Sequence, residues 1–124
     1  MINPKLKAYI FGALRKVWRW SPERREVLKD AKVNGHPDKY RCAECDKEGK
    51  RKFVHVDHVF PVIDPLRGFE GFDTYISRLY CDKAGLQILC TPCHSAKTKA
   101  ENKLRREAKK KAKEIKSPKG GKGL

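Results

Sequence analysis

Two pairs of cysteines, each separated by two residues, constrain this chain more than any other feature. The first pair is Cys42-Ala-Glu-Cys45 and the second is Cys90-Thr-Pro-Cys93. A two-residue gap lets a tight turn direct both thiolates at one ion, so the two pairs can form one tetrahedral zinc site. Disulfides are the alternative interpretation, but the paired spacing and the lack of an apolar export signal argue against them. The sequence therefore predicts a structural zinc ion.

The chain is short and strongly basic. It has 124 residues, with 30 Lys and Arg against 15 Asp and Glu, and a formal net charge of +15. This length predicts one domain, whose small centre needs a metal ion for stability. The charge predicts a polyanionic partner, with double-stranded DNA ahead of a membrane surface. No stretch has the length of a membrane span, so we expect a cytoplasmic protein. We also expect a monomer or weak dimer, without a small-molecule cofactor.

Apolar periodicity and turn residues predict the secondary structure. Residues 4–20 and a second segment ending near Ala31 have helical spacing, and Ser21 followed by Pro22 is typical of a helix start. Trp18 and Trp20 are predicted to anchor this helical pair in the core rather than to stack on bases. The remaining predicted elements are a strand over 52–59, a helix over 72–81, a strand over 86–89 and a helix from residue 92 or 93.

The C-terminal segment differs in composition from the preceding chain, because it is rich in basic residues. We expect a basic helical region over 1–39, a central domain over 40–104 and a basic, partly disordered tail over 105–124. Residues 108–116 can extend the last helix, and 117–121 end it. The cations of this segment are predicted to contact the DNA backbone. The alternative is a solvated run of charge that only aids solubility. The cations concerned are Arg105, Arg106, Lys109, Lys110 and Lys111.

A recognisable string of residues lies between and after the cysteine pairs. The segment from Tyr40 to Glu101 resembles the HNH endonuclease family, also called His-Me finger nucleases. Besides the cysteines, the matching residues are Val56-Asp57-His58-Val59-Phe60-Pro61, Leu86-Gln87-Ile88-Leu89-Cys90, and His94 with Lys97-Thr98. The helix signature Phe72-Asp73-Thr74-Tyr75-Ile76-Ser77-Arg78-Leu79-Tyr80-Cys81, and the chain as a whole, is similar to small free-standing HNH proteins of tailed bacteriophages.

The resemblance implies an α+β fold with a ββα-metal core, in which a zinc site joins the ends of the central segment. It implies a metal-dependent DNA endonuclease of a nicking or homing type, encoded by a phage and acting in the host cytoplasm. Asp57 and His94 then hold the catalytic ion, and His58 is the general base. A carboxylate with an imidazole suits Mg²⁺, Mn²⁺, Ni²⁺ or Zn²⁺, and a neutral imidazole can accept a proton at cellular pH.

Three features of the sequence qualify this expectation. The Asn that the family usually has before the second strand is replaced by Gly85, so another group, such as Asp82 or a backbone carbonyl, must support the base. Asp57 and His58 are neighbours, and strand alternation directs them to opposite faces unless the backbone bends near the strand end. His55 shares the face of Asp57, where it either orients the site or approaches the scissile phosphate, with a simply packed or solvent-facing histidine as the alternative.

Two further cations and one cysteine have open roles. Lys97, one turn beyond His94, and Arg78 are candidate DNA contacts, with an exposed helix face and a structural contact as the alternatives. Cys81 is predicted to be a buried thiol rather than a fifth zinc ligand. The competing function is a non-catalytic zinc-ribbon protein that binds nucleic acid, which would need neither the Asp-His pair nor His94.

Overall fold

The structure is a computed structural model that describes residues 2–116 and has α+β architecture. Two helices precede the first of two antiparallel hairpins. In the sequence, a third helix comes between the two strands of the second hairpin, and a long helix follows that hairpin. The elements are α1 (Pro4–Trp18), α2 (Pro22–Ala31), β1 (Tyr40–Arg41), β2 (Glu48–Gly49), η1 (Arg51–Phe53), β3 (Val54–His58), α3 (Phe72–Leu79), η2 (Lys83–Gly85), β4 (Leu86–Cys90) and α4 (Thr91–Lys116).

Two N-terminal helices form as predicted, and α2 has the predicted N-cap. Ser21 caps α2 as expected, with its hydroxyl accepting from the Arg24 amide at 3.4 Å. Helix α1 ends at Trp18 rather than at Trp20, because the Trp20 and Ser21 amides turn back onto the carbonyls of Val17 and Trp18. Trp18 is half-buried, but Trp20 is 75% exposed. The prediction that Trp20 anchors the core is therefore wrong.

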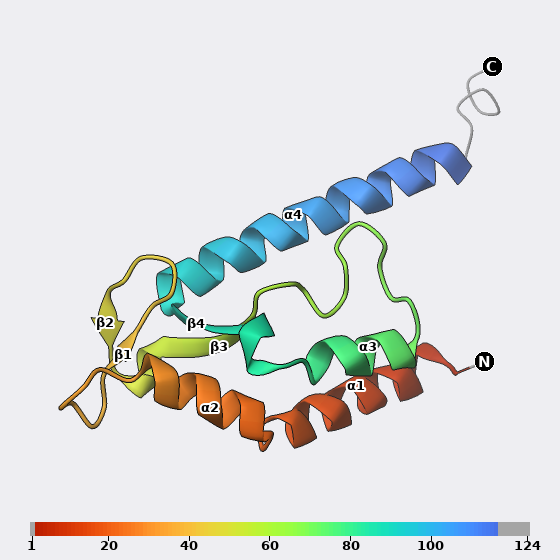
Figure 1. The fold of residues 1–124 in the computed structure, drawn as a ribbon. Coiled ribbons are helices and arrows are strands. Elements are labelled where there is room, and N and C mark those ends of the chain that lie inside the picture. The colour runs from red at the N-terminus through yellow and green to blue at the C-terminus, as the bar shows by residue number, and fades with distance from the viewer. Residues whose placement is uncertain (1, 117–124) are drawn as a thin grey trace.

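The hairpin of β3 and β4 is the centre of the molecule. Its register pairs Val54 with Cys90 and His58 with Leu86, and the buried side chains include Val54, Leu86, Ile88 and Leu89. Strand β3 starts later than predicted because residues 51–53 form a 3₁₀ turn. Helices α2 and α4 both contact this hairpin, and Figure 1 shows it between them.

Aromatic packing fixes α1 against α3. The Phe11 ring lies 4.7–5.5 Å from the rings of Phe69, Phe72 and Tyr75, and the Tyr80 hydroxyl donates to the Leu14 carbonyl at 3.0 Å. The two helices lie side by side in Figure 1. Helix α3 ends at residue 79, two residues earlier than predicted. This packing brings the C-terminal end of α1 to the end of β3.

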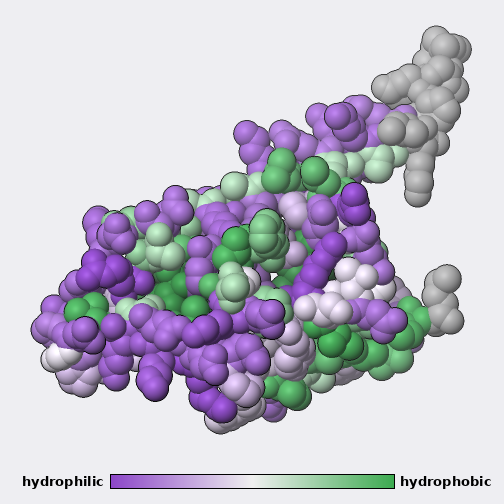
Figure 2. Space-filling view, viewed as in Figure 1, coloured by the Kyte–Doolittle hydropathy of each residue, from purple (hydrophilic) through white to green (hydrophobic). Residues whose placement is uncertain are grey.

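Helix α4 is a continuous helix of 26 residues. Its first half contacts β3 and β4, its second half begins beside the loop that contains residues 63–68, and its C-terminal end extends away from the body of the molecule (Figure 1). Much of its visible surface is hydrophilic (Figure 2). The expected boundary between residues 104 and 105 lies inside this helix, and the predicted disordered arm from 117 onward lies outside the described residues. Among residues 2–116, no helix has both the length and the apolar character needed to cross a membrane.

Candidate functional site

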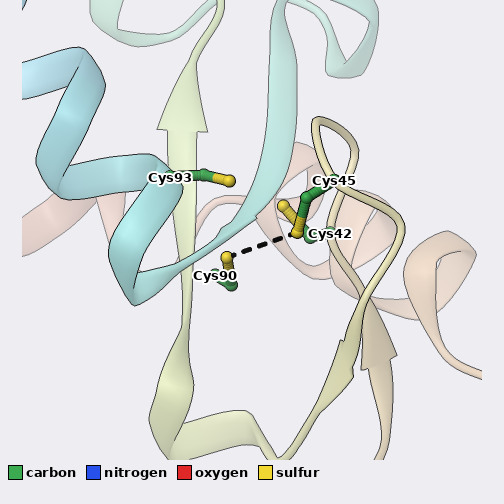
Figure 3. Close-up of side chains that lie close together, drawn as sticks. All are labelled: Cys42, Cys45, Cys90 and Cys93. Carbon is green, nitrogen blue, oxygen red and sulfur yellow. Dashed lines mark hydrogen bonds between the residues drawn. The ribbon is translucent and has the colours of Figure 1, made fainter.

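The four predicted cysteines converge at one end of the central hairpin. Cys42 and Cys45 lie on the turn between β1 and β2, Cys90 ends β4, and Cys93 is in the first turn of α4 (Figure 3). All four sulfurs lie within 4.8 Å of one another, and the Cys45 and Cys90 sulfurs are 3.7 Å apart. Tetrahedral Zn–S bonds of about 2.3 Å place two sulfurs about 3.8 Å apart. The cluster therefore fits a zinc ion.

The electrostatics of the cluster also suit a cation. Burial raises the pKa of Cys42. Hydrogen bonds from backbone amides, including those of Cys45 and Cys90, outweigh burial and lower this pKa to about 6. The neighbouring thiol of Cys90, together with burial, raises the pKa of Cys93 to about 12. Four adjacent thiols cannot all ionise without a compensating charge, which a divalent metal supplies. Cys81 stands outside this cluster, as predicted, and burial raises its pKa.

A cavity of about 390 Å³ opens at the other end of β3. Its walls come from α1, β3, residues 61–63, α3 and α4. Asp57, His58 and His94 all line it, so the structure brings the three predicted catalytic residues together. The strand is regularly paired through His58. Because the cavity lies at the strand end, neighbouring side chains from both faces reach it.

The two oxygens of Asp57 have different surroundings. Oδ2 accepts a hydrogen bond from Gln87 Nε2 at 3.0 Å and lies 3.2 Å from Lys97 Nζ. Oδ1 lies 3.8 Å from His94 Nε2. Two ligand atoms that are each about 2.1 Å from one ion can be at most about 4.2 Å apart. Oδ1 and Nε2 can therefore ligate the same divalent ion without a change in backbone position.

The ring of His58 is held on two sides. Its Nε2 lies 2.9 Å from the Leu79 carbonyl oxygen, and since a carbonyl can only accept, Nε2 carries the proton. In the tautomer that carries its proton on Nε2, the lone pair of the ring is on Nδ1. The Trp18 ring packs on the imidazole with centroids 4.8 Å apart. This arrangement leaves one defined nitrogen available to accept a proton.

His55 supports His94 rather than pointing to solvent. The Thr91 hydroxyl donates its single proton to the Phe53 carbonyl at 3.0 Å, so His55 Nε2 donates to Thr91 at 3.2 Å. The His55 ring stacks on the His94 ring, with centroids 4.6 Å apart and planes 15° apart. Burial, together with the nearby His94, lowers the pKa of His55. His55 is therefore packed against His94 rather than facing solvent, and its orienting role stays a prediction.

Lys97 is an internal bridge in this structure. Its ammonium donates to the His58 carbonyl at 2.9 Å and contacts the carboxylates of Asp57 and Glu101. Burial opposes the charge, but these carboxylates outweigh it and raise the pKa of Lys97. Its proposed contact with DNA phosphate stays a prediction. Gln87 and Glu101 were not anticipated, although Gln87 faces Asp57 across the register and Glu101 follows Lys97 by four residues.

Gly85, which stands where the resemblance to HNH nucleases leads one to expect an asparagine, supports the end of β3 through its backbone. Its carbonyl accepts from the Val59 amide at 2.9 Å, immediately after His58. A Cβ at this position would lie 2.8 Å from Cys81 Sγ. The backbone carbonyl thus supports the segment that follows the candidate base, and the adjacent thiol leaves little room for a side chain.

The other candidate DNA contacts are spread over a wider surface. Arg78 pairs with Glu70 at 3.1 Å and does not line the cavity. Arg105 does line it, and donates to the Ile63 carbonyl at 3.3 Å. The remaining predicted contacts are exposed on α4 beyond the cavity: Arg106, Lys109, Lys110 and Lys111.

Comparisons with known proteins do not place the chain in a family. No family model matches it, and neither a curated protein nor a solved structure matches it. The contacts of the two sites therefore carry the functional interpretation.

Proposed function

We propose that this protein is a metal-dependent endonuclease that hydrolyses phosphodiester bonds in DNA, with the ββα-metal arrangement of the HNH type formed by β3, β4 and α4. One observation carries the proposal. Asp57, His58 and His94 line a single cavity, with Asp57 Oδ1 facing His94 Nε2 and with the lone pair of His58 on Nδ1. A zinc-binding module without catalytic activity would need none of these three contacts.

Asp57 and His94 would hold the divalent ion, with Mg²⁺, Mn²⁺, Ni²⁺ and Zn²⁺ as candidates. Such an ion stabilises negative charge on the phosphate and on the leaving oxygen. Gln87 orients the carboxylate by holding Oδ2, and His55 fixes the ring plane of His94. Ligand-supporting contacts of this kind typically preserve the geometry of a metal site.

His58 would take a proton from the attacking water at Nδ1. The Leu79 carbonyl fixes the tautomer, and it also stabilises the imidazolium that forms, because Nε2–H continues to donate to it. Trp18 restricts rotation of the ring. The four cysteines would hold a second, structural zinc ion, which would tie the turn between β1 and β2 to the junction of β4 and α4.

The alternative is a zinc-containing protein that binds nucleic acid without cutting it. One observation favours it: the ammonium of Lys97 already neutralises Asp57 in this structure. In the nuclease, an ion on the Oδ1 side and Lys97 on the Oδ2 side would share the carboxylate.

The test is incubation of the purified chain with supercoiled plasmid and each of the four ions. We expect conversion to the open-circular form, and we expect His58→Ala to lose it by roughly 10²–10⁴-fold while DNA binding persists. His36→Ala is the matched control, since His36 lies in the exposed loop between α2 and β1. Nicking by His58→Ala at the wild-type rate, or no nicking by the wild type with any ion, would contradict the proposal.

A further inference from the structure

The cavity has a wall that the metal site does not use. Helix α1 and its C-cap residue contribute Phe11, Arg15, Trp18 and Arg19 to its lining. The backbone of Arg19 is still helical, and positions at these spacings share one face of a helix. Phe11 packs into the aromatic cluster on α3, and Trp18 packs on His58. These contacts fix the position of α1, and therefore they fix the backbone positions from which the side chains of Arg15 and Arg19 extend.

The charges around the cavity are unbalanced. Four lining residues are cationic, namely Arg15, Arg19, Lys97 and Arg105, and two are acidic, namely Asp57 and Glu101. Lys97 contacts both acids. Within residues 2–116, the ion pairs include neither Arg15 nor Arg19, and both residues are exposed. Among the described residues, the cavity therefore presents two guanidinium groups without a carboxylate partner.

We propose that Arg15 and Arg19 form a phosphate clamp, which binds the DNA backbone beside the bond that is cut. Guanidinium groups are planar and bind phosphate oxygens through two hydrogen bonds at once, so they suit this ligand better than ammonium groups do. The two residues are one turn apart, about 6 Å along the axis. The strand would pass between α1 and α4, with Arg105 on the opposite wall. The position next to the scissile bond rests on the proposed function, whereas binding of phosphate does not.

This assignment gives α1 a role that its packing alone does not explain. An ordinary solvated helix face would also carry exposed cations, and Lys5 and Lys16 of α1 are of that kind, because both are exposed and neither lines the cavity. The same helix thus offers a pair of cations in the cavity and a pair outside it. Their comparison separates a clamp from general basicity.

The experiment compares two double variants of the full chain. Arg15→Gln with Arg19→Gln removes the proposed clamp, and Lys5→Gln with Lys16→Gln removes the same charge elsewhere. Binding to a labelled duplex is measured across a salt series without added divalent ion. Each lost phosphate contact should reduce the slope of log affinity against log salt by about 0.9, so the clamp variant should lose about 1.8. The control should lose less than half as much.

Further measurements separate the possible outcomes. Zinc content and circular dichroism establish that both variants fold, and Arg15→Lys with Arg19→Lys should keep the slope because it keeps the charge. Equal slopes for the clamp and control variants would overturn the clamp, even if the wild type nicks plasmid. A wild type that fails to nick, with the slope difference present, would refute the nuclease and leave the clamp as a nucleic-acid site.

Discussion

The two candidate sites share elements but are assembled differently. Strand β4 carries Gln87, which holds Asp57 of the cavity, and Cys90 of the cysteine cluster, and α4 carries Cys93 and His94 in succession. The cluster consists of four identical groups, two from each short turn. The cavity combines unlike groups from α1, β3, α3 and α4, which hold one another through hydrogen bonds and ring contacts. We infer that the cluster fails as a unit, whereas the cavity loses function stepwise.

Loss of one sulfur ligand should have the largest effect. Cys90→Ser should release the zinc and unfold the hairpin, because metal binding in small modules contributes on the order of 10 kcal/mol to folding. Zinc stoichiometry and thermal unfolding measure both effects. Cys81→Ser is the matched control, since Cys81 lies outside the cluster. A Cys90→Ser variant that folds without zinc would show that the two sites do not differ in this way.

Loss of a supporting contact in the cavity should be graded. Gln87→Leu removes the donor to Asp57 Oδ2, and it should reduce nicking or catalytic-ion affinity by about 10- to 100-fold, the usual cost of losing an outer-shell partner. Asp57→Asn should cost more, because it removes a ligand charge. Both variants should keep one zinc per chain. Zinc loss in Gln87→Leu would mean that the sites are coupled through β4.

The smallest expected effect concerns stability near the base. Gly85→Ala places a methyl group against Cys81 Sγ, where the gap is 2.8 Å, and should destabilise the fold by about 1 kcal/mol. In a Cys81→Ala background the same change should cost much less. Urea unfolding of the four proteins in this cycle measures the coupling. An unchanged cost would show that the thiol is not what restricts position 85.

The difference between the sites also explains what the sequence could predict. The cysteine cluster follows from local spacing, and the start of α2 follows from Ser21 and Pro22. Gln87 could be found only from the register of β3 and β4, which brings it opposite Asp57 across 30 residues of sequence. Trp20 was misassigned because apolar character alone does not show where α1 ends.

The arrangement of the cavity was the hardest part to predict from the sequence, because it depends on contacts that a linear pattern cannot show. The resemblance supplied Asp57, His58 and His94, but the stacking of His55 on His94 and of Trp18 on His58 arises from packing between distant segments. The bridging position of Lys97 depends equally on the backbone at His58. Long-range packing of this kind is specified by shape and burial together, and no single spacing encodes it.

Helix α4 is held at several points along its length. Cys93 belongs to the cysteine cluster, Lys97 donates to the His58 carbonyl, and Arg105 donates to the Ile63 carbonyl. A rotation of about 10° about the first turn would move Arg105, about 18 Å further along the axis, by about 3 Å, which would break its hydrogen bond to Ile63, yet would hardly displace His94. The direction of the distal cations thus depends on the sulfur geometry and on the Ile63 contact together.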